Sequence, residues 1–379
     1  MIKAGIYIHV PFCNHKCNYC DYYSVEKDND DLHFFTLSLI KEIELVAKSH
    51  DKEWIFDTIY FGGGSPGLLE NNDLDIILNK LYKNFKISNN PEITIEINPK
   101  ENSYMDLKTY KKMGINRLSI GFQSLNSKLL LLLTRKHLKK DCFKTYENAI
   151  NAGFKNISVD LLYNIPGQKY KEWMADLKSI IQLNPNHITI ISLILESETI
   201  LHSSLQKISE LQPNNEFEET MFRKGSNELH NAGYFQYEIG HFSKPEMECK
   251  HNLHYWDLNP YLGFGPSAHS YNGIKRWWNT DSIKEYINYI SNKESPISNS
   301  ELLTKINRYN EVIINGFKTS KGISIKNIGD FYSKHSFQKA LEKWEKYLNI
   351  SNDQIIIKTE NFYLTDLVTS DFIIENHSL

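Results

Sequence analysis

Three cysteines lie within eight positions near the start of the chain, and their spacing is the clearest sign of chemistry. The segment Cys13-Asn-His-Lys-Cys17-Asn-Tyr-Cys20 has the pattern CX3CX2C. Thiolates at such spacing bind zinc or an iron–sulfur cluster. A structural zinc site uses four ligands, and His15 could supply the fourth only from inside the loop. A [4Fe–4S] cluster on three thiolates instead leaves one iron open to a ligand with an amino and a carboxylate group. We therefore expect a cluster on the three cysteines, with zinc as the alternative.

The composition excludes several classes of protein. Five cysteines are an odd number, and three of them are crowded together, which does not fit a disulfide framework. Cys142 and Cys249 stand alone, and we expect both to be buried. The net charge is −3, from 43 basic and 46 acidic residues, which gives no reason to expect nucleic acid as a partner.

The chain shows no membrane or export signal. Its longest apolar run, Leu129 to Leu133, is far shorter than the roughly 18 residues of a membrane span. The first ten residues lack the apolar region and cleavage site of a signal peptide. We therefore expect a cytoplasmic protein.

Short β-branched segments alternate with amphipathic ones from residue 5 to about 195. This alternation predicts βαβ units and a parallel sheet, the α/β class. Expected strands are Gly5–Val10, Asp57–Phe61, Glu92–Ile97, Arg117–Ile120, Asn156–Leu161 and His187–Leu193. Expected helices are 31–49, 72–84, 103–113, 140–152 and 170–182.

Residues capable of chemistry follow the expected strands. They are Cys13–Cys20 after the first, Gly62–Gly64 after the second, Asn98 after the third, Gln123 after the fourth and Asp160 closing the fifth. Open α/β sheets and α/β barrels both place their sites at the carboxyl ends of strands. The periodicity leaves the choice between these two folds open.

The remainder of the chain changes character twice. A helix is expected at 214–232, and an aromatic- and histidine-rich segment covers 234–278. Helices at 283–292, 300–317 and 336–348 and strands Gln354–Lys358 and Asn361–Leu364 then suggest a small α+β domain resembling a winged helix. The run Lys326–Tyr347 within this domain is not unusually basic, so DNA binding is not expected. We expect divisions at 1–232, 233–280 and 281–379.

The cysteine loop and a glycine loop together resemble a known family. CX3CX2C after the first strand and Gly-Gly-Gly-Ser-Pro after the second are similar to the radical S-adenosylmethionine (SAM) superfamily. Tyr7-Ile-His-Val-Pro-Phe-Cys13 and Phe61-Gly-Gly-Gly-Ser-Pro66 resemble, within it, the oxygen-independent coproporphyrinogen III oxidases and the related HemW haem chaperones. The resemblance implies a partial (β/α)6 barrel. It also implies a [4Fe–4S] cluster that receives one electron and splits SAM into methionine and a 5′-deoxyadenosyl radical.

The resemblance implies a SAM site as well. Tyr7 and Gly63 match contacts of the cluster-bound SAM, and Gly64 and Ser65 match contacts near a second SAM. Further matching positions are Glu96, Gln123 and Asp160 for the ribose and amino groups, Arg135 for the carboxylate, and Ile194 as an apolar contact. Each polar residue has a plainer alternative: Glu96 as a solvent-facing strand residue, Arg135 as a solvated helix end and Asp160 as a loop cap.

Histidines gather late in the chain. His241, His251, His254 and His269 lie within 29 residues, although the chain has only 14 histidines. His251-Asn-Leu-His-Tyr-Trp256 matches the HNxxYW motif that HemW proteins use for haem. An imidazole can ligate haem iron and aromatic rings can cover a porphyrin, which makes His251, Tyr255 and Trp256 candidates for haem binding. The alternative is that they are ordinary core residues.

Two features favour the chaperone over the decarboxylase. The decarboxylases carry a fourth cysteine two positions after the third, whereas here Cys20 is followed by Asp21 and Tyr22. They also carry an N-terminal extension that covers the active site, whereas 12 residues precede Cys13 here. The first hypothesis is therefore a haem chaperone, and the alternative is a coproporphyrinogen III dehydrogenase. A scaffolding protein with a zinc knuckle is a third, disfavoured class. Whether this chain itself turns SAM over as an enzyme stays open at this point. The resemblance implies a flavodoxin- or ferredoxin-type electron donor and acceptor haem proteins, which can include a membrane protein.

Overall fold

The parallel strands of the chain form one incomplete barrel. The computed structural model describes residues 1–205 and 215–375. Six parallel strands adjoin in chain order: β1 (Ile2–Val10), β4 (Trp54–Gly63), β5 (Ile87–Ile97), β6 (Arg117–Gln123), β7 (Asn156–Tyr163) and β8 (His187–Ser192). An open doubly wound sheet reverses its strand order, whereas sequential neighbours are the arrangement of an α/β barrel. The partial (β/α)6 barrel is thereby confirmed.

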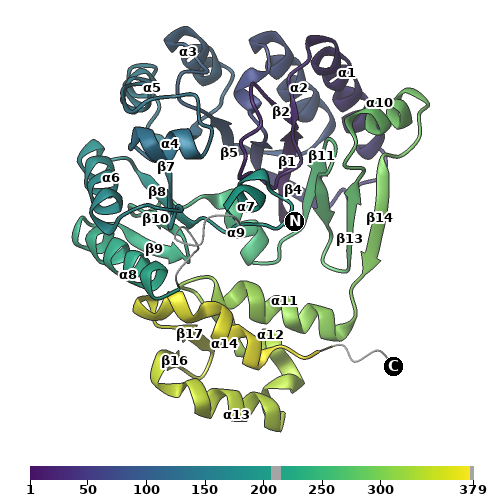
Figure 1. Ribbon diagram of the computed structural model, residues 1–379. Helices are drawn as coiled ribbons and strands as arrows, with labels where there is room; N and C mark the ends of the chain where they lie inside the picture. The colour runs from purple at the N-terminus through teal and green to yellow at the C-terminus, as the bar shows by residue number, and fades with distance from the viewer. Residues whose placement is uncertain (206–214, 376–379) are drawn as a thin grey trace.

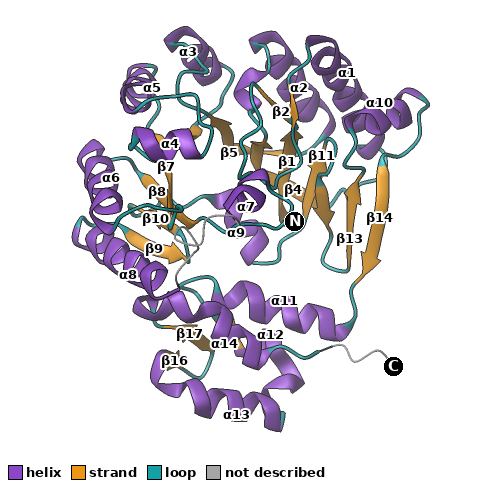
Figure 2. Ribbon diagram, viewed as in Figure 1, coloured by secondary structure: helices purple, strands orange, loops and turns teal. Residues whose placement is uncertain are grey.

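Helices cover the outside of this barrel (Figure 1; Figure 2). These are α1 (Asn29–Val46), α2 (Asn71–Asn84), α3 (Tyr104–Lys112), α5 (Lys139–Asn151), α6 (Tyr170–Leu183) and α8 (Asn215–Asn231). Two short helices, α4 (Ser127–Leu132) and α7 (Ile200–Leu205), lie instead beside the cysteine loop, where Asn18 bonds the Leu132 carbonyl and accepts from Leu201 N–H. The strand residues facing them are apolar and fully buried, among them Ile6, Ile59, Ile95, Leu118 and Val159. Burying these side chains against the helices is the main favourable term for the fold.

Further strands extend the sheet at both edges, so the barrel does not close. On one side β11 (Tyr261–Phe264) pairs with β1 in parallel, followed by the antiparallel β12 (His269–Tyr271), β13 (Lys275–Asn279) and β14 (Ile297–Leu302). On the other side β8 pairs with β10 (His241–Ser243), which pairs with β9 (Phe235–Glu238). Two short helices, α9 (Lys250–Trp256) and α10 (Ile283–Ser291), lie between these strands in sequence. β2 (Phe12–Cys13) and β3 (Val25–Glu26) bracket the cysteine loop.

The C-terminal unit lies on one side of the barrel, below it in Figure 1. It contains α11 (Lys305–Phe317), β15 (Ile323–Ser324), α12 (Ile325–Ile328), α13 (His335–Trp344), β16 (Leu348–Ile350), β17 (Gln354–Ile357) and α14 (Thr365–Phe372). Its three strands pair in the order β15-β17-β16, with helices packed on them, which matches the expected winged-helix-like domain.

Several expected elements differ from the structure. The helix expected at 300–317 begins only at Lys305, where the Thr304 side chain caps it, because residues 297–302 pair with β13 as β14. The strand expected at Asn361–Leu364 is wrong, since Thr359–Leu364 is a 3-10 helix. Part of the helix expected at 214–232 lies outside the described residues. The divisions at 232 and 280 stay predictions, and strand pairing crosses both positions.

No helix in residues 1–205 and 215–375 is long and apolar enough to cross a membrane.

Candidate functional site

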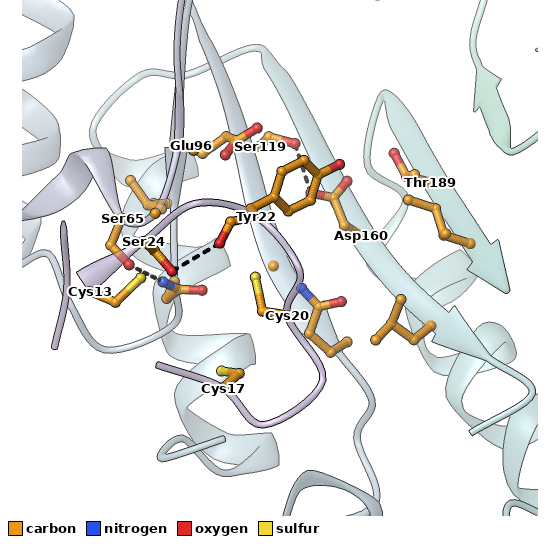
Figure 3. A pocket seen from close by; sticks show the side chains of 18 of the residues that line it. Cys13, Cys17, Cys20, Tyr22, Ser24, Ser65, Glu96, Ser119, Asp160 and Thr189 are labelled. Carbon is orange, nitrogen blue, oxygen red and sulfur yellow. Dashed lines mark hydrogen bonds between the residues drawn. The ribbon is translucent and has the colours of Figure 1, made fainter. Parts of the chain in front are cut away.

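A cavity of about 950 Å³ opens at the carboxyl ends of the barrel strands. The three clustered cysteines line it, and so do all nine residues expected to contact SAM: Tyr7, Gly63, Gly64, Ser65, Glu96, Gln123, Arg135, Asp160 and Ile194. Figure 3 shows the cysteine sulfurs on one side of this space and Glu96, Ser119 and Asp160 on another. Residues spread over 188 positions of sequence, from Tyr7 to Ile194, therefore face one space.

The cysteine loop is held at both ends and in its middle. Cys13 ends β2, and its carbonyl accepts a hydrogen bond from Lys27 N–H at 2.8 Å. Asn18 bonds the loop to the region after α4, donating from its side chain to the Leu132 carbonyl at 2.9 Å and from its N–H to Thr134 Oγ1 at 3.1 Å. The three cysteines form no disulfide and are partly exposed, so the loop presents its thiols to the cavity.

The thiols fit an iron–sulfur cluster better than a single ion. Nowhere in the described residues do three His, Cys, Asp or Glu side chains converge closely enough to hold one metal ion. A cubane is wider than an ion and suits thiols distributed around one end of a cavity. Burial raises the pKa of Cys13, and it raises the pKa of Cys20 to about 11. Metal binding would therefore displace protons from these thiols.

The glycine loop after β4 is packed against the cysteine loop. Gly64 N–H donates to the Val10 carbonyl at 2.8 Å, and Ser65 N–H donates to the Phe12 carbonyl at 2.7 Å. A Cβ at position 64 would lie 2.6 Å from the Phe12 carbonyl oxygen, and Gly63 has φ +105°, a conformation that favours glycine. Glycine is thus required here by close backbone approach, and the loop leaves its backbone open to a ligand.

Two carboxyl groups face the inside of the barrel. Tyr60 donates to Glu96 Oε1 at 2.8 Å, and burial raises the pKa of Glu96 to about 7. Asp160 accepts from Ser119 Oγ at 2.8 Å and from Ser158 Oγ at 2.9 Å. Glu96 is therefore not a solvent-facing strand residue and Asp160 is not a loop cap.

Arg135 is fixed beside the cysteine loop. Its guanidinium donates to the Gly121 carbonyl at 3.0 Å and to Asn98 Oδ1, and Nη1 lies 3.7 Å from Cys17 Sγ. The alternative of a solvated helix end is wrong. Gln123 ends β6 with φ 63° at an irregularity in the β6–β7 pairing, and Ile194 is 69% exposed at the cavity mouth.

The histidine motif forms α9, which enters the barrel. His251 is 1% exposed, its Nδ1 lies 2.7 Å from Thr58 Oγ1, and its Nε2 lies 2.8 Å from the Tyr255 hydroxyl. Its ring stacks on Tyr60 with centroids 5.1 Å apart. His251 and Tyr255 line the cavity. An iron ligated by His251 would have to displace one of these two partners.

The other aromatic and histidine candidates have different neighbours. Trp256 does not line the cavity, and its Nε1 donates to Glu238 Oε2 at 2.6 Å. His254 pairs with Asp57 at 2.7 Å, whereas His269 stacks on Trp278. His241 does line the cavity. Only part of the HNxxYW motif, including His251 and Tyr255 but not Trp256, therefore lines the same cavity as the cysteines.

The sequence reasoning missed several cavity residues. They are Tyr60, Arg117, Ser119 and Thr189. The signal was present, because polar residues alternate with apolar ones in the strands, as in Arg117-Leu-Ser119 and Ser158-Val-Asp160. Alternation puts the polar set on one face, and here that face is the barrel interior.

Comparisons with known proteins agree with this geometry. The family model of the Radical SAM superfamily matches residues 7–180. The chain is 34% identical over 330 residues to the haem chaperone HemW of Bacillus subtilis, with 86% of each chain covered. It is 34% identical over 357 residues to HemW of Buchnera aphidicola from Schizaphis graminum, covering 89% of this chain and 90% of that one. Among solved structures, Escherichia coli coproporphyrinogen III oxidase (HemN) matches with a TM-score of 0.85 at 20% identity, covering 98% of this chain and 90% of that one. At that identity the match supports the fold alone.

Proposed function

Because the chain belongs to the HemW haem chaperones of the radical SAM superfamily, we propose that it binds haem and delivers it to haem proteins. A [4Fe–4S] cluster and SAM are the cofactors of this proposal, and haem is its cargo. Coproporphyrinogen III dehydrogenase activity is the alternative function.

One observation carries the proposal. The three cysteines, the nine expected SAM contacts, and His251 and Tyr255 of the HNxxYW motif all line a single cavity. A zinc knuckle or a scaffolding role would not need a barrel interior lined with polar side chains from every strand.

The proposed roles follow from the positions of the side chains. Cys13, Cys17 and Cys20 hold the cluster, which when bound supplies one-electron chemistry to SAM. Arg135, already oriented by Gly121 and Asn98, has the planar donor geometry that suits a carboxylate. Glu96, Gln123 and Asp160 accept hydrogen bonds from the ribose and amino groups of SAM. Tyr7 and the 63–65 loop form the wall beside SAM, and Ile194 covers it at the cavity mouth.

For haem we propose His251 as the iron ligand and Tyr255 as its neighbour. Trp256 contacts Glu238 outside the cavity, so we assign it the positioning of α9 rather than contact with haem. A flavodoxin- or ferredoxin-type donor would reduce the cluster, and the acceptors would be haem proteins, including membrane-bound ones.

Oxygen-free purification followed by iron and sulfide analysis tests the cofactor. About four irons and four sulfides per chain are expected, with loss of both in a variant with serine at positions 13, 17 and 20. Haemin titration followed by transfer to apomyoglobin tests the cargo. Absence of haem transfer, or vinyl product formed at catalytic rates from coproporphyrinogen III with SAM and a reductant, would favour the alternative.

A further inference from the structure

One charged side chain deep in the barrel has no part in the roles given above. Arg117 is 2% exposed and lines the cavity from the inner face of β6. An arginine is cationic at every physiological pH, and burying such a charge without a partner is strongly unfavourable.

Arg117 has no direct partner among residues 1–205 and 215–375. No hydrogen bond reaches its guanidinium, no acidic oxygen lies within 4 Å of it, and its buried Nε is unpaired. In register beside it, Thr94 Oγ1 is also buried and unpaired. Two neighbouring polar groups therefore face the interior with unused hydrogen-bonding capacity.

The surrounding groups do not neutralise Arg117 by contact. Cys249, Glu92, Tyr60 and Tyr237 act on it electrostatically. Burial raises the pKa of Cys249 to about 12 and raises those of both tyrosines, so these three are neutral at pH 7. Glu92 is engaged elsewhere, since its Oε1 accepts the His251 backbone N–H at 3.2 Å. Glu92 therefore offsets the charge of Arg117 across space, but it leaves the buried Nε–H of Arg117 without an acceptor.

The anion is not the SAM carboxylate on geometric grounds. Arg117 opens β6, whereas Arg135, the residue assigned to the SAM carboxylate, bonds the carbonyl of Gly121 four residues further along, which at about 3.3 Å per residue is about 13 Å between the two Cα atoms of the strand. The proposed SAM contacts lie toward the carboxyl ends of the strands, and Arg135 is available there. Arg117 instead lies on the side where α9 enters, near His251.

We propose that Arg117 anchors a carboxylate of the ligand that enters the barrel beyond SAM, and that this carboxylate is a haem propionate. The inference rests on the proposed haem-binding function. The planar guanidinium would bind the carboxylate through two parallel hydrogen bonds, and α9 would hold the same ligand from the other side.

Haemin and its dimethyl ester, in which both propionates are blocked, provide the test. Titrations use the full chain with its cluster loaded, followed by visible absorption. The parent protein should bind haemin about 10- to 100-fold more tightly than the diester, as expected for a charge-assisted pair. Equal affinities in the parent protein would overturn the inference without any variant.

Variants then assign the difference to this residue. Arg117→Met should bind haemin and the diester equally, at the affinity the parent shows for the diester, while Arg117→Lys should keep part of the difference. Arg223→Met, an exposed arginine on α8, is the matched control and should discriminate like the parent. Unchanged discrimination in a folded Arg117→Met or Arg117→Lys protein would contradict the inference.

A parallel titration with SAM separates the two sources of a carboxylate. Arg117→Met should bind SAM with the parent affinity. Loss of SAM binding with unchanged haemin discrimination would reassign Arg117 to SAM and overturn the inference. If the parent protein binds no haemin at all, the proposed function itself fails, whereas binding without discrimination removes only the role of Arg117.

Discussion

The carboxyl group of Glu96 shows how the barrel interior tunes a single side chain. Burial raises its pKa to about 7, so the group gains its charge as the pH passes through neutrality. A carboxylate attracts the amino and sulfonium charges of SAM more strongly than a carboxylic acid does. SAM affinity of the cluster-loaded protein should therefore rise about tenfold between pH 6 and pH 8.5.

Binding measured in both buffers for Glu96→Gln checks this prediction. The variant should bind SAM weakly and with little change over that pH range. Glu246→Gln, an exposed residue, is the control and should follow the parent. A steep pH dependence that survives in Glu96→Gln would assign the titration to another group.

His251 allows a second prediction at this scale, because both of its ring nitrogens have partners. Removing the ring in His251→Ala deletes two buried hydrogen bonds and leaves a cavity against Tyr60, so the free energy of unfolding should fall by about 2–4 kcal/mol. Tyr255→Phe removes only the partner of Nε2 and should cost about 1 kcal/mol.

Haemin spectra of the same two variants test ligation. If His251 binds the iron, Tyr255→Phe should bind haemin at least as tightly as the parent, because Nε2 is released, and His251→Ala should lose the parent spectrum. A parent-like spectrum and affinity in His251→Ala would exclude His251 as the ligand.

At the scale of elements, helix α1 is joined to the 265–286 segment through one buried acid. Glu42 accepts hydrogen bonds from Tyr286 Oη at 2.6 Å, Gly265 N–H at 2.8 Å and Asn279 Nδ2 at 2.6 Å. A Cβ at Gly265 would lie 2.4 Å from the His9 carbonyl oxygen, so this network fixes a loop that touches β1.

The network predicts a pH dependence of stability. Burial raises the pKa of Glu42 to about 7 in the folded chain, whereas in the unfolded chain it ionises near 4.5. Between these values the folded state binds more protons, so this group's contribution to stability falls as the pH rises from about 4.5 to 7. The stability of the parent minus that of Glu42→Gln should therefore decrease by up to about 3 kcal/mol over this range.

Urea unfolding at several pH values between 4.5 and 7.5 measures that difference. Glu44→Gln, an exposed position on the same helix, is the control, because Lys80 lowers the pKa of Glu44, so the contribution of Glu44 to stability should not fall as the pH rises through this range. A constant difference between the parent and Glu42→Gln would show that Glu42 ionises normally in the folded chain.

The elements also show what the sequence could and could not predict. The six barrel strands were predictable because runs such as Ile93–Ile97 are rich in β-branched residues and are followed by polar ones. β14 was missed because Ile297–Leu302 is exposed throughout and becomes a strand only by pairing with β13. The 3-10 helix at Thr359–Leu364 resembles a strand in composition, and only its packing decides otherwise.

The candidate site could likewise be predicted only in part. Cysteine spacing and the glycine loop were sufficient to identify one side of the cavity. The inward direction of Glu96 and Asp160 was not readable, because alternation alone does not say which face of a strand meets solvent. The burial of Arg117 and the position of α9 depend on contacts between distant segments, which no local pattern contains.

At the scale of the whole molecule, the barrel strands carry apolar side chains on their outer face and polar side chains on their inner face. The helices bury the outer face, but the inner face carries unpaired groups such as Thr94 Oγ1 and Arg117 Nε. Such groups lower stability until a ligand satisfies them. We therefore expect the apolar contacts between the strands and the outer helices to provide most of the stability. Bound ligands should add to it by satisfying the polar groups of the inner face.

Ligand-linked stability tests this view of the molecule. SAM at 100 times its dissociation constant should raise the free energy of unfolding of the cluster-loaded protein by about 2.7 kcal/mol. The protein with serine at positions 13, 17 and 20 should stay folded, because its apolar core does not involve those side chains, but SAM should stabilise it far less without the cluster. Circular dichroism would establish folding, and unfolding with and without SAM would give the shift. An equal shift in both proteins would mean that SAM binds independently of the cysteines, and an unfolded triple variant would mean that the cluster is part of the core.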